Sequence, residues 1–305
     1  MTARKSKKDR KTDGPIAPLV LVHGLLGFGS IGPTRRLEYF RGVMRHLENN
    51  PKVLGGNAKV YVADLDPVDS IPSRAIQLRD FIQSRIYDHQ RQKFRYENVH
   101  VLAHSMGGLD ARYMIANLSM DIGDRSSMAE RVASLTTIGT PHLGTPFADF
   151  MMRLPIGQRA IQWANLYSIN IAAFKHLSVT YLVKERFNER MPDREGVQYF
   201  SYAGDVSPLQ VFPPMLVPAE IIRRSPDGGS NDGLVPVESA KFRYGPIDEE
   251  YDQVLSADHA AQIGHGWGHV PSFLRRGFSH LDFYAHLANA LARRVEELQR
   301  ASTTS

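Results

Sequence analysis

The 305-residue chain contains no cysteine, which excludes disulfide bonds and thiolate catalysis. No apolar run approaches the roughly 18–20 residues that a membrane-spanning helix needs. The chain also shows no apolar segment behind its basic start, as a secretory signal would require. These absences favour a globular protein in a reducing compartment, and among the possible locations we expect the cytoplasm.

Basic and acidic residues balance outside the first few positions. The formal net charge is +5, from 37 basic and 32 acidic side chains. Residues 1–11 hold six of the basic side chains and one acid, Asp9, so 31 residues of each sign remain. We expect residues 1–14 to form a disordered basic tail, because a charge run of this kind is usually solvated. No nucleic-acid partner is expected.

Apolar runs of strand length alternate with helical patterns along the rest of the chain. The predicted strands are residues 18–22, 58–62, 98–102, 133–138 and 197–202. Apolar residues at helical spacing occur at 37–47 and 76–86, and an amphipathic closing helix is predicted at 284–298. Strands that alternate with helices indicate a mostly parallel sheet covered on both faces. We therefore expect an α/β fold, with residues 15–305 as a single domain.

The segment from about 147 to 184 interrupts this alternation. It has apolar residues at helical spacing and delays the next strand by nearly sixty residues. An ordinary pair of core-packing helices would account for it. A helical lid over an active site would account for it as well, and we expect the lid.

Ser105 lies where a predicted strand meets a predicted helix. The motif Ala103-x-Ser105-x-Gly107 follows the apolar run 98–102 and precedes a helical pattern. Strand, small-x-Ser-x-small and helix form the nucleophile elbow of α/β-hydrolases, in which a tight turn lifts the hydroxyl above the sheet. The flanking residues are small because strand and helix pass close together there. The sequence therefore predicts an α/β-hydrolase fold with Ser105 as the nucleophile.

A serine nucleophile needs a base, and the base needs an acid that orients it. In this fold both follow the serine, with the acid first. The candidate acids are Asp205, at the end of a predicted strand, and Asp232, in a turn-rich loop before an apolar run; we favour Asp232. The base stays open at this point, because order along the chain permits His259, His265, His269 and His280.

Hydrolysis of an ester also needs two backbone N–H groups that stabilise the oxyanion. One is expected from Met106, directly after the nucleophile. The other is expected from Leu25, in the glycine-bearing loop that follows the first predicted strand.

Four segments together resemble the true lipases of bacteria, of the Pseudomonas and Burkholderia type. They are residues 19–28, the Ser105 elbow, residues 139–150 and residues 231–235. The resemblance implies an α/β-hydrolase fold with a helical lid, and hydrolysis of long-chain acyl esters. It also implies Ser105 as nucleophile, Asp232 as triad acid, and Leu25 and Met106 as oxyanion donors.

The resemblance also bears on the base. The family's catalytic histidine opens a His-Leu-Asp segment, which the chain matches literally at His280. Position favours His259, because residues 254–256 resemble the strand before the family's histidine and residues 283–289 resemble its closing helix. We therefore take His259 as the base.

Two features depart from the family pattern. The family's calcium-binding Asp is replaced by Ala261, and residues 213–217 offer no partner Asp. The secretion signal and the cysteine pair are missing too. We expect no calcium and no other cofactor. A zinc site from His259, His265 and His269 is not expected, because the intervening glycines give no rigid ligand spacing.

The sequence thus predicts a serine ester hydrolase that works through an acyl-enzyme. Its substrate is a lipid or another ester, with transient contact to a lipid interface. A lipase that cleaves acylglycerols is the favoured interpretation. The alternatives are a short-chain carboxylesterase and a non-catalytic binding protein with the hydrolase fold; the oligomeric state is left open.

Overall fold

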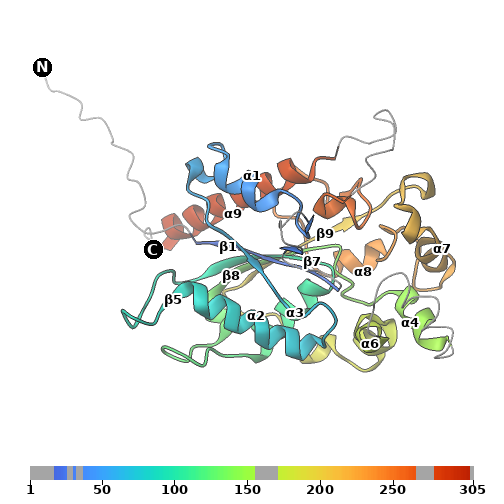
Figure 1. Ribbon diagram of the computed structural model, residues 1–305, viewed down its shortest axis with the longest axis horizontal. Coiled ribbons are helices and arrows are strands. Elements are labelled where there is room, and N and C mark those ends of the chain that lie inside the picture. The colour runs from blue at the N-terminus through green and yellow to red at the C-terminus, as the bar shows by residue number, and fades with distance from the viewer. Residues whose placement is uncertain (1–16, 26–29, 32–36, 155–170, 266–277, 303–305) are drawn as a thin grey trace, which may run out of the picture.

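The computed structural model describes residues 17–25, 30–31, 37–154, 171–265 and 278–302. At its centre lies a six-stranded sheet in the order β10-β9-β8-β7-β1-β4, whose neighbouring strands all pair in parallel (Figure 1). The strands are β1 Leu19–Val22, β4 Val60–Ala63, β7 Val99–His104, β8 Val132–Ile138, β9 Gln198–Gly204 and β10 Val254–Leu255. The expected α/β fold is confirmed.

Helices cover both faces of the sheet because the central strands are apolar on both sides. In β1, Leu19 and Leu21 join the core beneath α1 and α9, whereas Val20 and Val22 join the core beneath α2 and α3 (Figure 1). These helices are α1 Val43–Asn49, α2 Ile71–Ile86, α3 Met106–Asn117 and α9 His280–Ser302. Within the described part of the chain, no helix combines the length and the apolar character needed to cross a membrane.

In the described part of the chain, four further helices gather beyond one end of the sheet (Figure 1). They are α4 Pro146–Arg153, α6 Ile171–Leu177, α7 Leu216–Arg224 and α8 Val237–Lys241. The expected lid at 147–184 includes α4, α6 and a π turn at Thr180–Lys184; its residues 155–170 lie outside the described residues. Short 3₁₀ turns occupy Leu54–Gly56, Met128–Arg131, Asn188–Arg190, Pro208–Gln210, Pro213–Met215 and Ala261–Ile263.

The expected helix at 37–47 is wrong in its first half. Strand β3, Leu37–Glu38, pairs there with β2, Ser30–Ile31, and the helix begins only at Val43. The preceding Gly42 has a φ of 71°, a left-handed conformation that does not continue a right-handed helix. A second small antiparallel pair, β5 Tyr87–Asp88 with β6 Lys93–Phe94, was not expected. The closing helix is confirmed and begins earlier than expected, at His280. The predicted tail lies outside the described residues.

Candidate active site

Ser105 stands at the turn between β7 and α3. Its φ of 56° and ψ of −132° are strained for a residue with a side chain, as the elbow requires. Close packing surrounds this turn. A Cβ on Gly107 would lie 2.6 Å from the carbonyl oxygen of Val22, and one on Gly108 would lie 2.3 Å from Thr140 Oγ1. Glycine is therefore required at both positions, because β1 lies against Gly107 and the loop after β8 lies against Gly108.

Asp232 and His259 form a buried hydrogen-bonded pair. His259 Nδ1 lies 2.7 Å from Asp232 Oδ2, and the carboxylate is fully buried. The other carboxylate oxygen accepts from the backbone N–H groups of Leu234 and Val235, at 3.0 and 2.8 Å. Because an ionised carboxylate can only accept, Nδ1 carries the ring proton. In the neutral ring, Nε2 is then unprotonated and able to take a proton.

Ser105 and His259 line one cavity of about 380 Å³. Most of the surrounding wall is apolar, and it comes from α4, α6, the start of α7 and several loops around Ser105. It includes the side chains of Leu25, Phe147, Phe174, Leu177, Met215 and Leu234. A hydroxyl and an imidazole therefore border a space that favours an apolar ligand.

The other candidate acid and bases have different surroundings. Neither Asp205 nor His280 is among the described residues that line this cavity. His280 Nε2 is bonded at 2.9 Å to a backbone carbonyl oxygen just before α1. His265 lines the cavity, but its Nε2 is bonded to two backbone carbonyl oxygens at the end of β3, those of Glu38 and Tyr39. His269 lies outside the described residues. Among the described candidates, His259 is the one bonded to a candidate acid.

The loop after β1 passes directly against the serine. A Cβ on Gly24 would lie 2.6 Å from Ser105 Cβ, and the Gly24 N–H donates to the Tyr39 hydroxyl at 3.1 Å. Leu25, next in the loop, lines the cavity. Met106 opens α3, where backbone N–H groups attract negative charge. Both expected oxyanion donors therefore lie on segments that adjoin the nucleophile.

A buried arginine ties this loop to the elbow helix. Arg74 of α2 is fully buried and forms an ion pair with Asp110 of α3, with Nε 2.8 Å from Oδ2. Its other nitrogens donate to the carbonyl oxygens of His23, at 2.7 Å, and of Asp66. Burial raises the pKa of Asp110 to about 7, and Arg74 opposes this rise. Arg74 thus joins α3 to the loops that follow β1 and β4.

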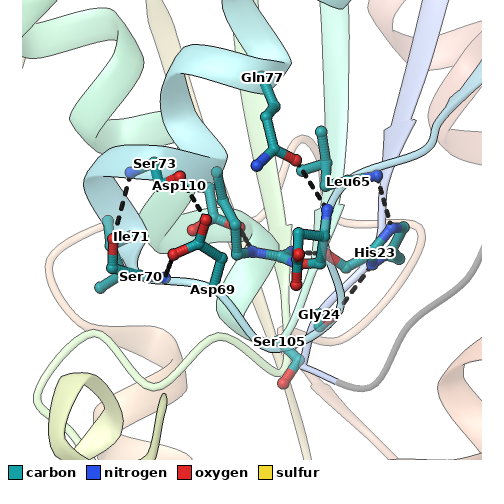
Figure 2. A network of polar contacts seen from close by, with 12 residues as sticks. His23, Gly24, Leu65, Asp69, Ser70, Ile71, Ser73, Gln77, Ser105 and Asp110 are labelled. Atoms are coloured by element: carbon teal, nitrogen blue, oxygen red, sulfur yellow. Dashed lines mark hydrogen bonds and ion pairs between the residues drawn. The ribbon is translucent and has the colours of Figure 1, made fainter. Parts of the chain in front are cut away.

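His23 is an uncharged part of the same network. Burial, together with nearby Arg74, lowers the pKa of His23 to about 4. Its Nδ1 lies 2.9 Å from the carbonyl oxygen of Gly24, and its Nε2 accepts from the Leu65 N–H at 3.1 Å (Figure 2). These bonds hold the peptide groups that lead into Leu25.

The sequence reasoning missed several residues that support the site. Gln262 donates to Asp232 Oδ2 at 2.9 Å, and its position three residues after His259 in a 3₁₀ turn is a signal that could have revealed it. Arg74 and Asp110 lie 36 residues apart on two different helices. Nothing local in the sequence marks them as partners.

The residues present do not fit the calcium site that the lipase resemblance suggests. Ala261, at the start of a 3₁₀ turn, has no side-chain oxygen. The neighbouring Asp258 uses its two carboxylate oxygens to accept from the backbone N–H groups of Ala261 and Phe212, at 2.7 and 2.8 Å. Calcium requires six to eight oxygen ligands, and Ala261 supplies no side-chain ligand at the position where the family has an aspartate.

Known proteins of similar sequence point to one class of enzyme. A family model described as "Putative serine esterase (DUF676)" matches residues 18–204. Triacylglycerol lipase 2 of Saccharomyces cerevisiae is 31% identical over 208 residues, which cover 68% of this chain and 57% of that protein. Triacylglycerol lipase of Burkholderia plantarii is 34% identical over 137 residues, which cover 44% of this chain and 32% of that protein. The chain therefore spans between about a third and somewhat more than half of the length of these curated relatives.

Solved structures agree at the level of the fold. The crystal structure of Staphylococcus hyicus lipase matches with a TM-score of 0.65 at 18% identity, and the match covers 97% of this chain and 99% of that one. The resemblance to bacterial lipases is thereby confirmed. Because the family model matches more than half of the chain, the protein belongs to this family of serine esterases, within the α/β-hydrolase fold that lipases share.

Proposed function

We propose that the protein hydrolyses carboxylic esters, with Ser105 as nucleophile, His259 as general base and Asp232 as the acid that orients the base. The observation that carries this proposal is the 2.7 Å bond between Asp232 and His259, whose imidazole borders the same cavity as the strained elbow serine. A buried carboxylate on Nδ1 selects the tautomer with a basic Nε2. It also stabilises the imidazolium that forms when the serine loses its proton.

In the proposed reaction, His259 takes the proton of Ser105 while the hydroxyl oxygen attacks the ester carbonyl carbon. The N–H groups of Leu25 and Met106 stabilise the resulting oxyanion. The tetrahedral intermediate expels the alcohol, which receives its proton from His259, and an acyl-enzyme remains. Water deprotonated by the same imidazole then attacks the acyl-enzyme and releases the carboxylic acid.

We propose long-chain acylglycerols as the substrate class. The apolar wall beside Ser105 supports this choice, as do the two curated relatives named triacylglycerol lipases. An acyl chain gains about 0.8 kcal/mol for each methylene group that it buries, so an apolar cavity favours long chains. In this proposal α4 and α6, which contribute Phe147, Phe174 and Leu177 to the wall, are the part of the expected lid that covers the acyl chain.

A series of p-nitrophenyl esters from acetate to palmitate tests both halves of the proposal. We expect kcat/KM to rise with chain length, and Ser105→Ala to lower turnover by roughly 10³–10⁶-fold. A fluorophosphonate probe should label the wild type and spare the variant. Labelling combined with a preference for acetate would favour a short-chain carboxylesterase. Neither labelling nor hydrolysis would favour a binding protein that has only the hydrolase fold.

A further inference from the structure

We propose that Gln262 is a positioning residue for the catalytic acid: its side-chain amide holds the Asp232 carboxylate in the orientation that meets His259. This inference rests on the proposed function and adds one more side chain to the acid–base part of the site. Gln262 lies in the 3₁₀ turn Ala261–Ile263 and is fully buried.

The Asp232 carboxylate is surrounded by four donors. Gln262 Nε2 lies 2.9 Å from Oδ2, the same oxygen that accepts from His259 Nδ1 at 2.7 Å. The backbone N–H groups of Leu234 and Val235 occupy Oδ1. With two donors on each oxygen, the carboxylate group cannot rotate without breaking a bond. Because the carboxylate only accepts, the nitrogen of the amide must face it.

Two strand ends leave room for this amide. A Cβ on Gly139, directly after β8, would lie 2.4 Å from Gln262 Oε1. A Cβ on Gly204, the last residue of β9, would lie 2.3 Å from Gln262 Nε2. Heavy atoms cannot approach so closely, so a side chain at either glycine would displace the amide. The carboxyl ends of β8 and β9 thus form a slot that Gln262 fills.

The side-chain oxygen of Gln262 interacts with the imidazole of His104. The Gly24 N–H donates to the Tyr39 hydroxyl, and this hydroxyl lies 2.7 Å from His104 Nδ1. When the hydroxyl donates to Nδ1, the neutral ring carries its own proton on Nε2 and can donate from there. His104 Nε2 and Gln262 Oε1 are both buried, and neither has a hydrogen-bond partner within the described part of the chain. Burial lowers the pKa of His104, and the interaction with Gln262 opposes this effect in part by raising the pKa.

Loss of this amide should be visible in the titration of the base. The Gln262 N–H disperses part of the negative charge of Asp232, so its removal leaves more charge to stabilise the protonated form of His259. The other ionisable groups around the imidazole stay in every variant below. They are Asp232, Asp258, His104, His265 and Tyr39.

The test compares Gln262→Met, which removes the amide at similar length, with Gln262→Glu, which places a second carboxylate beside Asp232. Gln83→Met is the matched control, because Gln83 is also a buried amide but lies on α2 and accepts from the Asp121 N–H. Two quantities are measured: the pH dependence of kcat/KM for a p-nitrophenyl ester, and the pKa of His259 by NMR titration of its ring resonances.

For Gln262→Met we expect the pKa of His259 to rise by about half a unit to one unit. We expect kcat to fall about tenfold, with KM nearly unchanged, because the amide acts on the base and not on substrate binding. Gln262→Glu should shift the pKa of His259 less than Gln262→Met does, because two carboxyl groups that share a buried site hold a proton between them and so keep a donor on Asp232. Gln83→Met should leave both quantities at their wild-type values.

A His259 pKa in Gln262→Met equal to that of the wild type would overturn the proposal, whatever the rate. If Gln262→Met does not fold, Gln262→Asn takes its place, because the shorter amide stays polar but draws its donor away from Asp232. The NMR titration does not depend on hydrolysis. A shifted pKa in a protein without Ser105-dependent activity would therefore retain this inference and remove the proposed function.

Discussion

The nucleophile side of the candidate site is held by a buried ion pair, whereas the acid–base side is held by uncharged donors around a single carboxylate. Behind Ser105, Arg74 and Asp110 are both fully buried, and Arg74 also donates to the His23 carbonyl oxygen. Around Asp232, the donors other than the imidazole are two backbone N–H groups and the amide of Gln262.

This difference follows from what each side must do in the proposed reaction. The nucleophile side needs a fixed backbone, because oxyanion stabilisation depends on where the N–H groups point. An ion pair with several backbone contacts provides that rigidity. The acid–base side needs its negative charge to remain available to the imidazole. A cation bonded to Asp232 would neutralise that charge, whereas uncharged donors hold the carboxylate and leave its charge in place.

The largest expected effect concerns the base itself. His259→Ala should lower kcat/KM by about 10³–10⁶-fold, since removal of a triad base is as severe as removal of the nucleophile. His280→Ala should retain near-native activity, because His280 Nε2 is bonded to a backbone carbonyl oxygen before α1 and His280 is not among the described residues that line the cavity. The measurement is esterase activity of the two variants at equal folded concentration. An inactive His280→Ala beside a nearly active His259→Ala would overturn the assignment of the acid–base side.

The next effect concerns the ion pair. Arg74→Met should lower the free energy of unfolding by about 3–5 kcal/mol, because Asp110 is left buried without its partner. The double variant Arg74→Met/Asp110→Leu should recover most of that stability, since a buried pair can be replaced by apolar side chains at little cost. The kcat/KM of the double variant should stay on the order of 10²-fold below that of the wild type, because the His23 carbonyl still lacks its donor and the oxyanion loop is misplaced.

Urea unfolding and ester hydrolysis separate these two effects. Arg224→Met is the control, because Arg224 pairs with Glu220 on the exposed surface of α7, where ion pairs contribute little. Full activity in the double variant would show that the nucleophile side needs the pair for stability alone.

The smallest expected effect concerns His100, which belongs to neither side of the candidate site. It provides a reference for how the free energy of unfolding depends on pH. Burial lowers the pKa of His100, near the start of β7, from 6.5 to about 4. Between pH 6.5 and 4, the unfolded state binds a proton at His100 and the folded state does not. The contribution of His100 to the free energy of unfolding is therefore fully present above pH 6.5 and declines as the pH falls toward 4. At 1.36 kcal/mol for each pKa unit, the contribution is about 3 kcal/mol.

His100→Asn should flatten the decline of the unfolding free energy between pH 6.5 and 4 by about that amount. The measurement is urea unfolding at a series of pH values, with activity at pH 7 as the reference. An unchanged slope would show that His100 already takes up a proton in the folded state, and acid inactivation would then have to be assigned to other groups.

Features of the fold that depend on a short run of residues could be predicted from the sequence. The Ser105 elbow, the main strands and the closing helix each follow from a short run of residues whose apolar spacing and small flanking positions are visible in one window. The helix expected at 37–47 failed in its first half because residues 37–38 pair with β2 and the left-handed Gly42 does not continue a right-handed helix.

The sequence by itself determined the fold class, the elbow at Ser105 and the order of acid and histidine behind it. The tertiary structure decided which candidate histidine meets Asp232, because His259 and Asp232 stand on loops 27 residues apart that approach each other when β9 and β10 pair. It also decided the partners of Arg74 and the slot around Gln262. These contacts depend on how the ends of several strands converge at one edge of the sheet, and no single stretch of sequence encodes that convergence.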